Sequence, residues 1–180
     1  MNFLNIDASK AKENKLYMIL KILLPITVVF KMWYLSELEF HYFNFTFNGF
    51  LGRIIVYAIG GGIAYVLQLL AVSFSYSLFY RSKYTPCDEN FICKINKPTY
   101  SATCYFVLII ANVLTGLLNF FGYGAPISST FIVILLPTIM SIFSICAIVA
   151  LLYKFCEKGE LKELVTSMAL PAIVMLLFLR

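Results

Sequence analysis

Residues 98–153 make up a stretch that contains no charged side chain. A helix needs about 20 apolar residues to cross a hydrocarbon core about 30 Å thick, so this stretch is long enough to cross, turn and return. A segment with two glycines and a proline, residues 122–126, separates its apolar halves. The stretch therefore predicts two membrane-spanning helices, at about residues 101–121 and 127–153.

The whole chain shares this apolar character. Of its 180 residues, 61% are hydrophobic and 13% are charged, whereas soluble globular domains contain about 25% charged residues. Lipid cannot hydrogen-bond to the backbone, so each span must be a helix or part of a closed barrel. The apolar runs are continuous rather than alternating, which is not the pattern of barrel strands. The sequence predicts an all-α, polytopic transmembrane helical bundle that fills residues 1–180 as a single membrane domain.

Three further apolar runs predict spans at about residues 16–36, 54–80 and 164–179. The last run would measure about 24 Å as a helix and contains Pro171, so it either crosses a thinned bilayer or is re-entrant. We therefore expect five spans, or four if the last is re-entrant. Pro25 lies mid-way along the first predicted span and should kink it, and Pro137 lies near the middle of the fourth. Residues 37–52, which are rich in aromatic and polar side chains, are expected to form an interfacial loop.

The basic residues alternate between the ends of the predicted spans. With a cytosolic N terminus, most of the fourteen Lys and Arg residues fall on cytosolic segments, as the positive-inside rule requires. The net charge of +5 is explained by these flanks, and the chain has no basic domain or RNA-binding motif, so we expect no nucleic-acid partner. The expected location is the inner (plasma) membrane of a bacterium with the N terminus in the cytoplasm, or an organelle membrane in a eukaryote.

Lys21 and Lys31 are the charged residues within the predicted spans. Each lies about five residues from an end of the first span, so each ammonium is expected to reach the lipid headgroups. The alternative is a lysine that faces the bundle interior or binds an anionic lipid.

Small and polar residues mark the predicted second span. Gly60, Gly61 and Gly62 let a neighbouring helix approach closely, with a hinge as the alternative. Gln68 can hydrogen-bond to another helix or line a cavity, and the same holds for three serines on this span, Ser73, Ser75 and Ser77.

The predicted third span carries Asn112, Thr115, Gly116 and Asn119. Asn112, Gly116 and Asn119 recur at i, i+4 and i+7, which places them on one helical face. A buried asparagine usually hydrogen-bonds to a neighbouring helix, at about 0.6–2 kcal/mol each. We expect this face to pack against another helix, for which the glycine triplet offers a suitable surface. The alternative is a polar permeation path lined by Gln68, Asn112, Thr115 and Asn119.

No pattern of catalytic or metal-binding residues is present in the sequence. Cys87 and Cys93 have C-x5-C spacing, whereas structural zinc sites use closer pairs and four ligands. His41 is the only histidine, and no acidic residue lies within a predicted span, which argues against a proton-coupled carrier. We expect no metal, no cofactor and no enzymatic activity.

Part of the second half resembles the Yip1-domain membrane proteins. The likeness rests on Gly122-Tyr123 followed by Pro126, on the long apolar span after them, and on the charged linker 154–163 before a final short span. That family consists of five-span proteins of membrane traffic and organisation. The resemblance therefore implies five spans and a scaffolding role, although the family's Asp-Leu-Tyr-Gly-Pro segment is absent here.

The N-terminal part resembles a different family. Residues 10–17, followed by Leu24 and Pro25, look like the start of immunity proteins against pore-forming colicins, which are small, basic, multi-span inner-membrane proteins. The main expectation is a non-enzymatic scaffold or accessory subunit that contacts the lipid bilayer and other membrane proteins or itself. The alternatives are a small transporter or channel subunit and a bacteriocin immunity protein.

Overall fold

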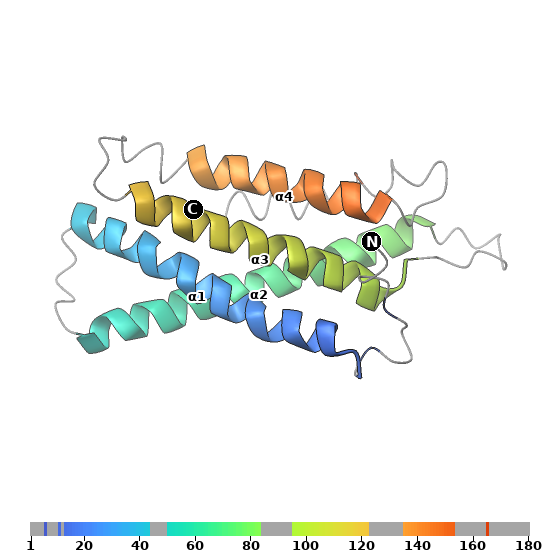
Figure 1. Cartoon of the computed structure of the whole chain (residues 1–180), viewed down its shortest axis with the longest axis horizontal. Helices are drawn as coiled ribbons and strands as arrows, with labels where there is room; N and C mark the ends of the chain where they lie inside the picture. The colour runs from blue at the N-terminus through green and yellow to red at the C-terminus, as the bar shows by residue number, and fades with distance from the viewer. Residues whose placement is uncertain are drawn as a thin grey trace.

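The structure is a computed structural model that describes residues 6, 11, 13–43, 50–83, 95–122, 135–153 and 165. These residues form four helices: α1 (Lys15–Phe43), α2 (Phe50–Lys83), α3 (Lys97–Gly122) and α4 (Leu136–Tyr153) (Figure 1). The described part of the chain contains no strand, which confirms the predicted all-α class.

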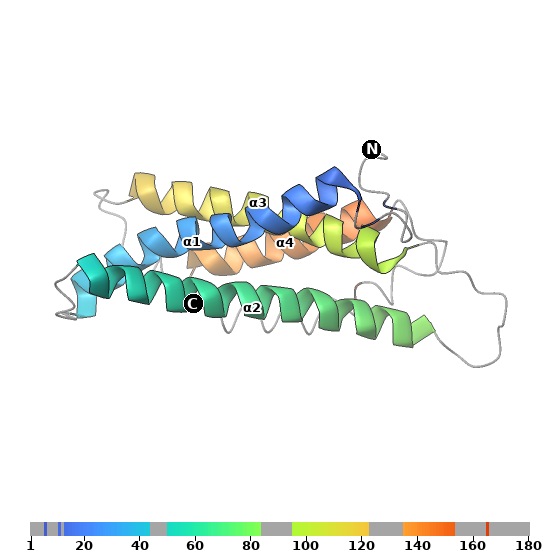
Figure 2. The ribbon, with the colours of Figure 1, turned by 90° about the horizontal axis from the view of Figure 1, so that it is seen from below.

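Successive helices run in opposite directions. In Figure 1, α1 and α3 run one way along the bundle, and α2 and α4 run the other way. Helix α3 is central, because it packs against α1, α2 and α4 (Figure 2). Such an alternating bundle is the arrangement that successive spans of one bilayer require.

An asparagine side chain caps the start of two helices. Asn14 Oδ1 accepts the N–H of Tyr17 at 3.1 Å at the start of α1, and Asn96 Oδ1 accepts the N–H of Thr99 at 2.9 Å at the start of α3. Each amide oxygen satisfies one of the backbone donors that the first helical turn leaves without a partner. The polar residue before each apolar run thus sets where the helix begins.

The first two helices are longer than the sequence predicted. Helix α1 continues through residues 37–43, which had been expected to begin the first loop, and α2 begins at Phe50 rather than near residue 54. The reason is local, since residues 37–43 contain neither glycine nor proline, the strongest helix breakers. Pro25 lies inside α1, which continues past it, and Thr27 Oγ1 donates a hydrogen bond to the Leu24 carbonyl at 2.9 Å.

Helix α4 is described from Leu136, and residues 127–134 of the predicted fourth span lie outside the described part of the chain. Pro137 is the second residue of the described helix. Its expected place near the middle of the fourth span stays a prediction.

Two segments among the described residues are long and apolar enough to cross a membrane, Tyr57–Leu78 and Lys97–Leu118. Thr138–Tyr153 is a shorter apolar helix. The described residues therefore do not support a count of five membrane spans. The fifth predicted span, residues 164–179, falls outside the described part of the chain except for Val165.

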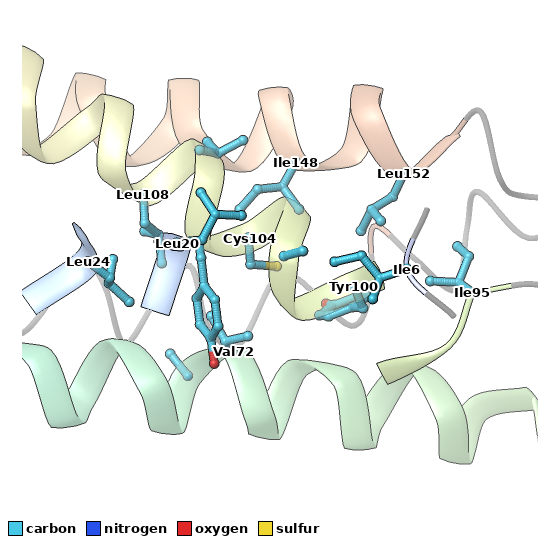
Figure 3. Close-up of a cluster of buried hydrophobic side chains, with 14 of the residues drawn as sticks. Ile6, Leu20, Leu24, Val72, Ile95, Tyr100, Cys104, Leu108, Ile148 and Leu152 are labelled. Atoms are coloured by element: carbon cyan, nitrogen blue, oxygen red, sulfur yellow. The ribbon is translucent and has the colours of Figure 1, made fainter. Parts of the chain in front are cut away.

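The apolar core surrounds α3. Leu20 and Leu24 from α1, Val72 from α2, and Ile148 and Leu152 from α4 are buried around it (Figure 3). The α3 residues at the centre of this cluster include Tyr100, Cys104 and Leu108.

Ile6 closes one end of this core. Its side chain is fully buried beside Tyr100 and Leu152 (Figure 3). Its N–H donates to Thr99 Oγ1 at 3.0 Å, and its carbonyl accepts from Asn96 Nδ2 at 2.7 Å. The start of the chain is thereby attached to the start of α3.

Candidate functional site

Helix α2 has large apolar side chains on its outer face and small or polar ones on its inner face. The outer residues recur at helical spacing and are each at least half exposed: Ile59, Ile63, Val66, Leu70 and Phe74. The inner residues are buried: Gly61, Ala64, Gln68, Ala71, Val72 and Ser75. A helix on the surface of a soluble protein has the opposite pattern, with its apolar stripe toward the core.

The same inversion is found in α4. Ile139, Ile142 and Phe143 are exposed, while Ser141 and Ser144 are buried. Helix α1 also exposes an apolar stripe that includes Ile19, Ile22 and Ile26. Contiguous apolar surface of this extent is rare on a monomeric soluble protein and is normal where lipid is the solvent.

The inner faces of α2 and α3 meet at an amide pair formed by Gln68 and Asn112. Gln68 Nε2 donates to Asn112 Oδ1 at 3.3 Å, and Asn112 Nδ2 donates to Gln68 Oε1 at 3.4 Å. The two residues are only 2% and 3% exposed. Each amide therefore satisfies the other, and the pair links two helices in a place where water is excluded.

Only one glycine of the triplet lies at a tight helix contact. A Cβ atom added to Gly61 would lie 3.3 Å from Val29 Cγ2 of α1, whereas one added to Gly60 or Gly62 would meet nothing within 4 Å. Gly61 thus lets α1 approach α2, and the other two glycines are open.

Gly116 of α3 also faces α1. A Cβ atom added there would lie 2.5 Å from Phe30 Cε1, so the absence of a side chain makes room for the Phe30 ring. The predicted packing against the glycine triplet is not what the structure shows for Asn112 and Gly116. Gly116 and Gly61 instead contact consecutive residues of α1, and Asn112 reaches α2 about two turns away from the triplet.

The hydroxyls of Thr27, Thr103 and Thr115 are buried and hydrogen-bond within their own helices. Thr115 Oγ1 donates to the Ala111 carbonyl at 2.8 Å and is 2% exposed. Thr115 therefore lies beside the amide pair but does not bridge helices. Asn119 belongs to α3 by its backbone, and its side chain is outside the described part.

The two lysines of α1 have different surroundings. Lys21 is exposed, and its Nζ lies 4.5 Å from the centroid of the Tyr17 ring. Lys31 is only 5% exposed, so the expected snorkelling of this residue is wrong and the alternative, a lysine that faces the bundle interior, describes it. The physical reason is helical phase, since Lys31 follows Leu24 and Val28, both buried, at i+7 and i+3.

Two polar contacts join residues whose pairing the sequence did not predict, although Ser75 was expected to bond to another helix. The hydroxyls of Ser75 and Tyr100 share a hydrogen bond between α2 and α3, and the Tyr76 and Tyr100 rings pack edge to face at 5.4 Å. The other contact joins Ile6 to Asn96 and Thr99. An Asn before an apolar run is a helix-start signal, so the sequence could have indicated that Asn96 caps α3. It could not have indicated the bonds of Asn96 and Thr99 to Ile6.

The described residues offer no cluster of metal ligands or nucleophiles. They contain no group of three or more His, Cys, Asp or Glu side chains placed to hold a metal ion. Cys104 is buried and Cys146 is exposed, both as free thiols, while Cys87, Cys93 and the His41 side chain lie outside the described part. The polar groups that are described serve mainly to join helices.

Comparison with known proteins gives no relative: no protein-family model, curated protein or solved structure matches this chain. The likenesses to Yip1-domain and colicin-immunity proteins therefore stay expectations from sequence alone. The apolar outer faces of the helices and the polar contacts between them are the basis for inferring a function.

Proposed function

We propose that the protein is a non-enzymatic integral membrane protein that acts as a scaffold or accessory subunit in a membrane complex or in membrane organisation. The proposal includes five spans, a cytosolic N terminus and a Yip1-like role. The observation that carries it is the inverted polarity of α2, with large apolar side chains outside and Gln68, Ser75 and small residues inside. Such a helix is stable in lipid and poorly suited to water.

The interior favours a structural role over transport. A polar permeation path would need side chains with hydrogen-bonding capacity directed at a lumen. Gln68 and Asn112 instead bond to each other, and Thr115 bonds to its own helix. The amide pair holds two helices together and the Thr115 hydroxyl is satisfied within α3, so a small transporter or channel subunit is the less favoured alternative.

The outer face of α2 supports association with another helix. Gly62 is exposed and a Cβ atom there would meet nothing, while Ala58, four residues earlier, is also exposed. Small residues four apart on a lipid-facing surface allow two helix backbones to approach closely. We propose that a helix of a partner membrane protein, or of a second copy, packs here.

The test is association in mild detergent. The wild-type chain and the variants Gly62→Leu and Ile63→Leu are purified. Light scattering measures the particle mass of each, and mass spectrometry identifies any bound proteins. We expect the wild type and Ile63→Leu to run as a complex and Gly62→Leu to lose the partner while staying folded. A wild-type monomer that co-purifies with nothing would remove the support for a scaffold.

The topology has its own test. Reporter fusions after residues 43, 83, 122 and 153 should alternate between the two sides of the membrane, with the fusion after residue 83 in the cytosol. Two adjacent fusions on the same side would contradict the proposed crossing of the helix between them.

A further inference from the structure

Lys31 is the one charged side chain that is buried among those the structure describes. It is 5% exposed, whereas Lys21, ten residues earlier on the same helix, is exposed. An ammonium removed from water is costly unless an anion or several acceptors compensate it. A charged Lys31 is therefore stable only where its surroundings supply negative charge or oxygen atoms.

No described residue supplies that charge. Lys31 Nζ has no hydrogen bond or ion pair with any residue in the described part of the chain. The positions three and four residues away on α1 are Thr27, Val28, Tyr34 and Leu35, none of them acidic. The amides of Gln68 and Asn112, both described, are bonded to each other.

The position of Lys31 along α1 points to the source of an anion. It lies about five residues, or about 7.5 Å, before Ser36, where the apolar part of α1 ends and lipid headgroups are expected; the helix itself continues to Phe43. The flanking residues Val29 and Phe30 face Gly61 and Gly116, so α2 and α3 approach this turn closely. Arg53 belongs to the first turn of α2, and α2 begins at the end of the bundle where α1 finishes (Figure 1).

We propose that Lys31 binds the phosphate of an anionic phospholipid whose headgroup enters the bundle at the end where α1 finishes and α2 begins. Basic residues in pockets between transmembrane helices can bind anionic headgroups. The inference rests on the membrane location in the proposed function, and it adds a ligand that a scaffold role does not require.

The experiment uses the full chain in a neutral detergent. Phosphatidylglycerol, phosphatidylcholine or inorganic phosphate is added, and lipid retention is measured by native mass spectrometry together with the Tm. The variants are Lys31→Met, Lys31→Arg and, as a matched control on the same helix, Lys21→Met.

For the wild type and Lys21→Met, we expect phosphatidylglycerol, but not phosphatidylcholine, to be retained and to raise the Tm by several degrees. Lys31→Met should bind phosphatidylglycerol about tenfold more weakly, the loss expected for one charge-assisted contact, and Lys31→Arg should keep part of the binding.

Three results would overturn the proposal. One is a wild type that retains both lipids equally, a measurement that needs no variant to fold. Another is unchanged phosphatidylglycerol binding in Lys31→Met. The third is inorganic phosphate alone reproducing the effect, which would make this a site for free anions. Alkaline extraction of membranes distinguishes failure of this proposal from failure of the proposed function. A protein that stays in the membrane but shows no lipid selectivity would contradict only the lipid site. A protein that alkali extracts from the membrane would contradict both proposals.

Discussion

Helices α2 and α3 have nearly the same apolar character but different positions in the bundle. Each contains a segment long and apolar enough to span a membrane, yet 61% of that apolar stretch is buried in α3 and 33% in α2. Helix α3 contacts three other helices, whereas α2 packs chiefly on α1. The two helices differ in the size of the side chains on each face. The mean hydropathy of a helix does not depend on which face carries the large side chains.

On α2, the large apolar residues point away from the bundle and the small ones point inward. On α3, buried positions carry residues of every size, from Ala102 to Tyr100. A peripheral membrane helix needs only one packed face, and small residues on that face let it approach its neighbour closely. A central helix must fill space on several sides. Matched substitutions in the two helices test whether α3 is the more tightly packed of the two.

The largest expected difference is between two leucines. Leu108→Ala in α3 removes a side chain that is 3% exposed and should lower the free energy of unfolding by about 2–5 kcal/mol, because the cavity is filled only in part. Leu70→Ala in α2, where the side chain is 59% exposed, should cost less than about 0.5 kcal/mol. Unfolding by sodium dodecyl sulfate, followed by circular dichroism, measures both. Equal losses would mean that α2 is as buried as α3.

A pair of glycines should give the next largest difference. Gly116→Ala places a Cβ atom 2.5 Å from the Phe30 ring and should destabilise the bundle by about 1–3 kcal/mol. Gly62→Ala meets no atom within 4 Å and should stabilise α2 by about 0.5–1 kcal/mol through helix propensity. The same unfolding assay reports both, and opposite signs are the expected result. A loss in both variants would contradict the open position of Gly62.

The amide pair can be tested by a double-mutant cycle. Gln68→Leu or Asn112→Leu alone leaves one buried amide without its partner and should cost about 0.6–2 kcal/mol. The double variant should be less destabilised than the sum of the two, because neither amide remains. Strict additivity would show that the two side chains do not interact.

The smallest effect is expected for the tyrosine contact between α2 and α3. Tyr100→Phe removes the hydroxyl that bonds to Ser75 but keeps the ring against Tyr76, so the expected loss is about 1 kcal/mol. Tyr153→Phe, at an exposed position of α4, is the control and should change stability by less than about 0.5 kcal/mol. If the two variants behaved alike, the Ser75–Tyr100 bond would contribute nothing measurable.

Much of the helical architecture could be predicted, because continuous apolar runs report where helices lie. The predicted starts and ends were less accurate. Residues 37–43 were expected to be a loop because aromatic and polar residues alternate there, yet nothing in that segment breaks a helix.

The contacts of the candidate site were harder to predict than its members. The sequence drew attention to Gln68 and Asn112 separately, as amides in apolar runs. Their pairing depends on how far α2 is shifted along α3, and side-chain packing sets that shift rather than any local pattern. For the same reason three adjacent glycines looked equivalent, although only Gly61 contacts α1. The burial of Lys31 likewise depends on which face of α1 turns inward.

The attachment of Ile6 to the start of α3 has a consequence for how the chain is assembled. The bonded residues Ile6 and Thr99 are 93 positions apart, so Ile6 is synthesised well before α3 and gains these partners only once α3 has been made. The end of the bundle around Tyr100 and Leu152 therefore closes late, after α3 has been made. The attachment also fixes sidedness: whichever compartment holds Asn96 must hold Ile6, so a chain inserted with α3 reversed could not close its own end.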